Sequence, residues 1–247
     1  MDLILLSLPN MGTDWLAEKY AQHNPSLKYF REFFNPITNQ EYLDVLGTAF
    51  GSEMVSNHKN IADPNVPIEE VFQATWMKTN HNFTKENYSP FRLEFFSKEF
   101  KCFVLLRKTE LVFPPSRWEV VAWYDAIWNS LTANKTNLEP QIAKLVDFSE
   151  RHANTVNKRI VAACEICTQK ITTDAKKFNI PVIHYESLML MSKAELKEYI
   201  KGLPGVSDPN HLSELIVTSR RPKRNTFDKT GATDFLNELR RIFQPTI

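Results

Sequence analysis

The most constraining feature of the sequence is an apolar run at residues 3–8, close to the N-terminus, in which Ser7 is the polar exception. Such a short run is typical of a central parallel strand that is buried on both faces of a sheet. A turn containing Gly12 follows, and Thr13 or Asp14 can then cap a helix that extends to about residue 23. The segment therefore predicts a buried strand, a tight turn and a helix in succession.

The same two patterns recur along the chain. Strands are expected at residues 74–79, 101–107 and 181–185, and helices at residues 118–131, 141–178 and about 193–201. Helices that alternate with buried strands predict an α/β fold, with a central parallel β-sheet flanked by helices on both faces. Ligands bind beyond the carboxyl ends of the strands in this architecture, so the informative residues follow Leu8, Met77 and Leu106.

Length and charge limit the class of protein further. A chain of 247 residues buries roughly 70–75% of its unfolded surface, which predicts one domain spanning residues 1–247. Thirty Lys and Arg residues against 29 Asp and Glu leave a net charge of +1, too small for a nucleic-acid or acidic-membrane partner. No apolar run approaches the roughly 20 residues that span a bilayer. We therefore expect a soluble globular protein in which any anion site is local.

The N-terminus and the cysteines indicate a reducing compartment. Asp2 stands where a secretory signal carries basic residues, and the apolar run after it is too short for a signal core. The three cysteines are Cys102, Cys164 and Cys167, and this number cannot complete a disulfide framework. The pair at 164 and 167 has no second Cys or His pair at zinc spacing, so helix packing is favoured over metal binding. We expect a cytoplasmic protein with no metal.

The six glycines are too scattered for either common nucleotide-binding motif, which excludes both G-x-G-x-x-G and G-x-x-x-x-G-K-[ST]. The turn after the first strand still offers an anion site, because the N–H groups of Gly12, Thr13 and Asp14 converge at a helix N-terminus. The alternative is an ordinary strand-to-helix turn capped by Thr13 or Asp14.

Residues 7–16, Ser-Leu-Pro-Asn-Met-Gly-Thr-Asp-Trp-Leu, resemble the 5′-phosphosulfate loop of sulfotransferases that use 3′-phosphoadenylyl sulfate. The pattern of that loop is approximately S-x-P-K-[SA]-G-T-[TS]-[WL]-L. Asn10 stands where the family has a lysine, and Asp14 stands where it has a hydroxyl. The resemblance implies that the nucleotide is bound by Pro9, Asn10, Met11, Gly12, Thr13, Asp14 and Trp15.

A second segment, residues 76–81, is similar to the K-T-H segment that carries the catalytic lysine of the family. Lys78 fits the lysine, whereas Asn80 stands at the position of the base and His81 follows one residue late. In carbohydrate-directed relatives a glutamate near paired phenylalanines acts as the base, and Glu32 lies in a comparable segment. The resemblance implies Lys78 as a catalytic residue, with Glu32 or His81 as the base.

A third segment, residues 104–110, is similar to the strand end whose arginine holds the 3′-phosphate, and Arg107 fits that arginine. The serine of the family lies eight residues later, at Pro115, so Ser116 fits if the chain bulges by one residue. Residues 182–188 are similar to the h-h-x-Y-E-D-L strand of the family. A C-terminal basic segment that covers the nucleotide corresponds to Arg220, Arg221, Lys223 and Arg224.

Together these segments imply a P-loop NTPase-like sulfotransferase fold over nearly the whole chain. The implied reaction is an in-line displacement that moves a sulfuryl group from 3′-phosphoadenylyl sulfate to a hydroxyl or amine acceptor, leaving adenosine 3′,5′-bisphosphate, without a metal. Asn10 and Asn80 keep open a second hypothesis, a protein that binds these nucleotides with impaired catalysis. A nucleotide-dependent kinase is a third, disfavoured by the absence of G-K-[ST]. Residues 35–75 and 108–140 are expected to shape the acceptor pocket.

Overall fold

The computed structural model describes residues 2–34, 44, 47–48, 67–87, 90–112, 118–220 and 232–243. Within these ranges the chain forms a five-stranded, fully parallel sheet of order β2-β3-β1-β4-β5. The strands are β1 (Asp2–Ser7), β2 (Tyr29–Arg31), β3 (Phe83–Asn87), β4 (Phe100–Leu106) and β5 (Val182–His184). The α/β architecture with a central parallel sheet is therefore confirmed.

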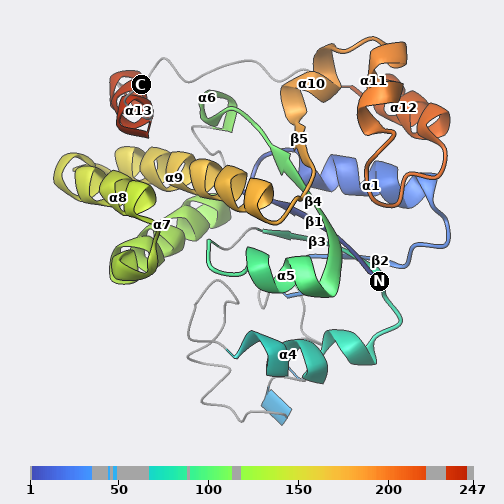
Figure 1. The fold of residues 1–247 in the computed structure, drawn as a ribbon, viewed down its shortest axis with the longest axis horizontal. Helices are drawn as coiled ribbons and strands as arrows, with labels where there is room; N and C mark the ends of the chain where they lie inside the picture. The colour runs from blue at the N-terminus through green and yellow to red at the C-terminus, as the bar shows by residue number, and fades with distance from the viewer. Residues whose placement is uncertain are drawn as a thin grey trace.

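Helices cover both faces of the sheet (Figure 1). One face carries α1 (Thr13–His23), α10 (Tyr185–Leu190), α11 (Lys193–Ile200) and α12 (Pro209–Thr218). The other carries α4 (Ile68–Ala74), α5 (Leu93–Glu99), α7 (Trp118–Ala133), α8 (Pro140–His152), α9 (Val156–Lys177) and α13 (Ala232–Phe243). Short elements complete this list: η1 (Trp76–Lys78), α6 (Thr109–Val112) and η2 (Lys135–Asn137).

The central position of β1 explains its mostly apolar sequence. Leu3 and Leu5 pack into the core beneath α1, α11 and α12, whereas Ile4 and Leu6 pack into the core on the opposite face. Successive side chains of a strand point to opposite faces, so a strand covered on both sides favours apolar residues on both faces, and Ser7 is the buried polar residue of β1. The sequence pattern and the burial of β1 therefore agree.

The strand expected at residues 74–79 is wrong. Ala74 ends α4, and a 3₁₀ turn, η1, follows over Trp76–Lys78. The Thr75 hydroxyl donates to the carbonyl of Val71 in α4 (2.6 Å). The Trp76 indole donates to Asp2 (2.7 Å), so this segment packs against the start of β1. The strand beside β1 is β3, Phe83–Asn87, five residues further along the chain than η1.

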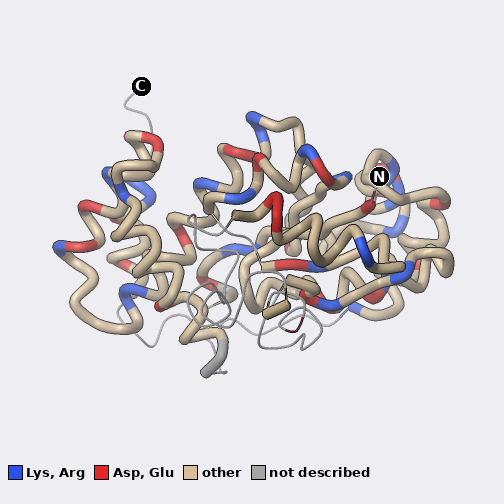
Figure 2. The backbone as a smooth tube through the Cα atoms, turned by 90° about the horizontal axis from the view of Figure 1, so that it is seen from below, with Lys and Arg blue, Asp and Glu red and all other residues tan. Residues whose placement is uncertain are grey.

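The remaining expected elements occur with small changes at their ends, except that one expected helical stretch is divided in two. The helical stretch expected at 141–178 is two helices, α8 and α9, because the chain turns at Ala153 and restarts where the Thr155 hydroxyl accepts from Lys158 N–H (3.3 Å). In the part of the chain that is described, no helix is both long and apolar enough to cross a membrane. Acidic and basic positions are interspersed along the backbone (Figure 2).

Candidate functional site

The loop from β1 to α1 lies at the carboxyl edge of the sheet and is fixed from both sides. Asn10 has φ of 67° and Gly12 has φ of 88°, so two residues adopt left-handed backbone within three positions. The Tyr124 hydroxyl of α7 donates to the carbonyl of Pro9 (3.2 Å), and the Asn10 amide donates to the carbonyl of Val112 (2.9 Å). With Met11 fully buried, the loop is a packed, rigid turn.

The N-terminus of α1 receives no side-chain cap, so the cap expected from Thr13 or Asp14 is wrong. Gly12 is the N-cap residue and has no side chain to offer. The Thr13 hydroxyl is hydrogen-bonded to the Ser7 hydroxyl instead. Asp14 is turned toward the basic side chains of β2 and β3. The first-turn N–H groups of α1 are therefore left without an acceptor from a cap, which favours an anion at this point.

Arg107 follows β4 and lies at the same edge of the sheet. Only 2% of the residue is exposed, yet its Nε and Nη1 atoms have no hydrogen-bond partner among the residues described. Burial lowers the pKa of the guanidinium, while Tyr185 and Glu186 oppose this effect, and an arginine stays charged under all ordinary conditions. A buried charge without hydrogen-bond partners is costly, and an anionic ligand would supply the missing acceptors.

The Tyr185 ring connects Arg107 to the loop. The guanidinium carbon of Arg107 lies 4.5 Å from the centre of this ring. On the side of the loop, a Cβ atom added to Gly12 would lie 2.7 Å from Tyr185 Cε2, closer than real Cβ contacts allow. The edge of the ring also packs against Trp15, with the ring centres 6.1 Å apart. Tyr185 therefore contacts both the β1–α1 loop and the buried Arg107.

The end of α12 brings a second arginine to this edge. The Trp15 indole donates to the Ser219 hydroxyl (3.0 Å), and Arg220 follows directly. The Nε and Nη2 atoms of Arg220 are buried and lack partners within the described ranges. The other predicted basic residues, Arg221, Lys223 and Arg224, and the predicted Ser116 lie outside the described residues, so their roles stay predictions.

A charged cluster lies on the other side of the loop, between α1, β2 and β3. Lys85 Nζ is 3.0 Å from Asp14 Oδ1 and also pairs with Glu32. The Lys85 side chain is 5% exposed and that of Glu32 is 12% exposed, so this pair is largely removed from water. Arg31 reaches the second oxygen of Asp14 at 2.7 Å. Glu32 therefore lies beside the first turn of α1, where Lys85 pairs with both Glu32 and Asp14; the sequence analysis did not single out this lysine.

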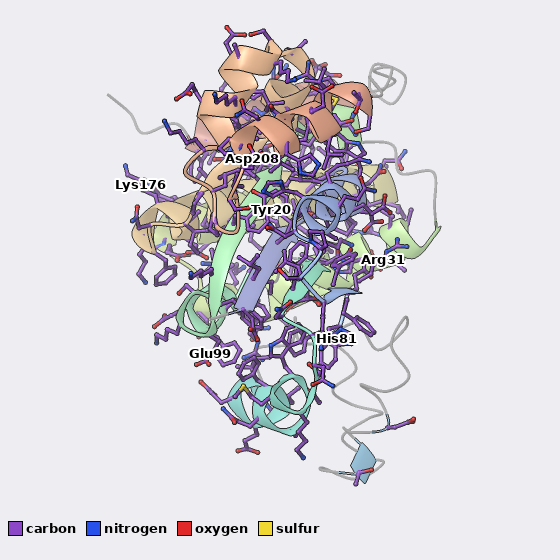
Figure 3. All side chains as sticks on the ribbon, turned by 90° about the vertical axis from the view of Figure 1, so that its right-hand side faces the viewer. Tyr20, Arg31, His81, Glu99, Lys176 and Asp208 are labelled. Carbon is purple, nitrogen blue, oxygen red and sulfur yellow. The ribbon has the colours of Figure 1, made fainter. Side chains whose placement is uncertain are left out.

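Lys78 and His81, in contrast, lie at the amino edge of the sheet. Both precede β3, and the neighbouring Trp76 bonds to the first residue of β1. His81 packs edge-on against Phe30, with the ring centres 5.0 Å apart. In Figure 3 it lies near the level of Glu99, which precedes β4, and below Arg31. The structure does not bring these two residues to the loop at 9–15.

A buried carboxyl group follows Lys85 in β3, with its side chain on the opposite face of the strand. Glu86 is 3% exposed and accepts from the Thr84 hydroxyl (2.6 Å) and the Phe34 N–H (3.2 Å). Burial raises the pKa of this carboxyl to about 8, although the two hydrogen bonds and Lys85 lower it and Glu32 raises it further. Glu86 therefore carries a proton at neutral pH.

The described residues contain no group of three or more His, Cys, Asp or Glu side chains that could hold a metal. All three cysteines are buried free thiols, and burial raises the pKa of Cys102 and of Cys164 to about 12. Comparison with family models, with curated proteins and with solved structures finds no match for this chain.

Glu86 makes the stability of the fold depend on pH. Because its pKa is raised from 4.5 in the unfolded chain to about 8 in the fold, its contribution is complete below pH 4.5 and is lost as the pH rises to about 8. We expect the free energy of unfolding to fall by roughly 3–5 kcal/mol over this window, at about 1.4 kcal/mol per unit of pKa shift. Urea unfolding at a series of pH values measures this slope.

Glu86→Gln should remove most of the slope between pH 4.5 and 8, because an amide does not titrate in this range. The amide oxygen can still accept from the Thr84 hydroxyl and the Phe34 N–H, so the fold should be kept. Glu94→Gln, on the exposed face of α5, is the matched control and should keep the wild-type slope. An unchanged slope in Glu86→Gln would contradict the assignment.

Proposed function

We propose that this protein is a sulfotransferase that binds 3′-phosphoadenylyl sulfate along the carboxyl edge of the sheet and transfers its sulfuryl group to a hydroxyl or amine acceptor. The observation that carries the proposal is Arg107, a buried guanidinium with two unpartnered nitrogens among the described residues, fixed by Tyr185 against an uncapped anion loop. A ligand with two separated anionic groups on one nucleoside suits this pair of sites.

The orientation of the nucleotide follows from the two sites. We assign the 5′-phosphosulfate to the first-turn N–H groups of α1, which begin at Thr13. We assign the 3′-phosphate to the Arg107 guanidinium, which can bind a phosphate with two parallel hydrogen bonds. Trp15 lies between Tyr185 and Ser219 and offers an aromatic surface for the adenine. Arg220 is placed to add a second cation.

The catalytic lysine in this proposal is Lys85. It takes the role that the sequence pattern gave to Lys78, since its ammonium group lies 3.0 Å from Asp14 in the first turn of α1. In the transfer step the acceptor oxygen or nitrogen attacks the sulfur, and the bond from sulfur to the bridging oxygen breaks. Adenosine 3′,5′-bisphosphate leaves with that electron pair, and Lys85 stabilises the charge on the departing oxygen. Glu32, paired with Lys85, accepts the acceptor proton.

A protein that binds the nucleotide without turnover is the second candidate. Asn10 replaces the expected loop lysine, and its amide donates to Val112 instead of adding charge to the loop. Removing one charged donor aimed at developing charge typically costs about 10²–10³ in rate. The two candidates predict the same binding and differ only in transfer.

Arg107→Ala tests the 3′-phosphate assignment. We expect it to weaken adenosine 3′,5′-bisphosphate binding by about 10- to 100-fold, because charged hydrogen bonds contribute about 1.5–3 kcal/mol. Adenosine 5′-monophosphate, which lacks the 3′-phosphate, should lose only a few-fold. Titration calorimetry measures both, with exposed Arg151→Ala on α8 as the control. Equal losses for the two nucleotides would show that Arg107 does not contact the 3′-phosphate.

Lys85→Met tests the assignment of the catalytic lysine against Lys78→Met at the opposite edge of the sheet. We expect Lys85→Met to lower the transfer rate at saturating donor by about 10²–10³. Lys78→Met should leave this rate within a few-fold. Transfer of labelled sulfate to a panel of hydroxyl and amine acceptors measures the rate, and thermal unfolding checks each fold. Full activity in Lys85→Met would exclude this residue. Nucleotide binding with no transfer by the wild type would favour the second candidate.

A further inference from the structure

The Asp14 carboxylate lies in the first turn of α1, where the proposed site binds the 5′-phosphosulfate. Asp14 is the second residue of α1, and its side chain does not cap the helix. Instead its two oxygens face Lys85 (3.0 Å) and Arg31 (2.7 Å), and 41% of the side chain is exposed. An anion bound to the first-turn N–H groups would therefore approach a carboxylate that is already paired with the nearby cations.

The charges around the loop cancel. Lys85 and Arg31 contribute two positive charges, and Asp14 and Glu32 contribute two negative charges within the same ion-pair cluster. The backbone N–H groups are left as the main attraction for an anion on this side of the loop.

The other end of the proposed site is only partly compensated, by Glu186 beside Arg107. Arg107 and Arg220 each have two buried nitrogen atoms that lack partners in the ranges described. Glu186, which lowers the net charge near Arg107, accepts from the N–H of Lys108 (3.1 Å). The two ends of the site therefore differ in charge, although both lie at one edge of the sheet.

We propose that Asp14 is a specificity-determining residue that weakens the 5′-phosphate contribution to binding, so that recognition depends mainly on the 3′-phosphate. The inference rests on the proposed function, since it concerns the same nucleotide site. Asp14 competes with the incoming anion for Lys85, and its charge repels a dianion at the loop. Nucleotides with a highly charged 5′ end and no 3′-phosphate, such as ATP, are disfavoured for the same reason.

The experiment compares two ligands that share the 3′-phosphate, adenosine 3′-monophosphate and adenosine 3′,5′-bisphosphate. The ratio of their dissociation constants measures what the 5′-phosphate adds. We expect this ratio to be below about ten in the wild type and to rise about tenfold in Asp14→Asn, with the larger change in the bisphosphate. Asp14→Ser is a second variant in case the first unfolds. Glu18→Gln, which removes one charge a turn further along α1 on an exposed position, should leave the ratio unchanged.

The outcomes separate this inference from the proposed function. If the wild type binds both ligands and the Asp14 variants keep the wild-type ratio, the nucleotide site stands and the role of Asp14 is wrong. If the Glu18 control shifts the ratio as much as Asp14→Asn, the effect is general electrostatics and the role is again wrong. If no protein binds either ligand, the proposed function fails and this inference fails with it.

Discussion

The arrangement of the carboxyl edge depends on the contact between Gly12 and the Tyr185 ring. The β1–α1 loop and the start of α10 can approach this closely only because Gly12 has no Cβ atom and tolerates a φ of 88°. The guanidinium of Arg107 lies over the same ring, 4.5 Å from its centre. One aromatic side chain thus joins the ends of β1, β4 and β5, which come from distant parts of the sequence.

Several polar and charged groups are buried in and around this edge at a cost to stability. Among the described residues they are Arg107, with two unpartnered nitrogens, Lys85, paired with two carboxylates, and Glu86, whose pKa is raised by burial. Buried polar and charged groups are tolerated in proteins mainly where they are paired or where they serve a site. The cores on either face of the sheet, where aliphatic and aromatic side chains are closely packed, stabilise the frame that holds these groups.

The sequence predicts the parts of the fold that local patterns determine. The apolar run of β1, the glycine turn, α7 and the strand ending at Arg107 all have local signals, and they placed the loop and the arginine at one edge. β3 was missed because Thr84, Lys85 and Glu86 are polar, and the groups that pair with them, at residues 14, 32 and 34, are remote in sequence. Residues 74–79 gave the opposite error: they were expected to form a strand, whereas Trp76 lies in a 3₁₀ turn and its ring packs against Phe100.

We propose that one nucleotide spans the β1–α1 loop and Arg107. The decisive measurement is a crystal structure of the protein with adenosine 3′,5′-bisphosphate. We expect the 3′-phosphate within hydrogen-bond distance of the Arg107 guanidinium and the 5′-phosphate over the first-turn N–H groups of α1. A nucleotide bound elsewhere, or bound here with its 3′-phosphate away from Arg107, would show that this assignment is wrong.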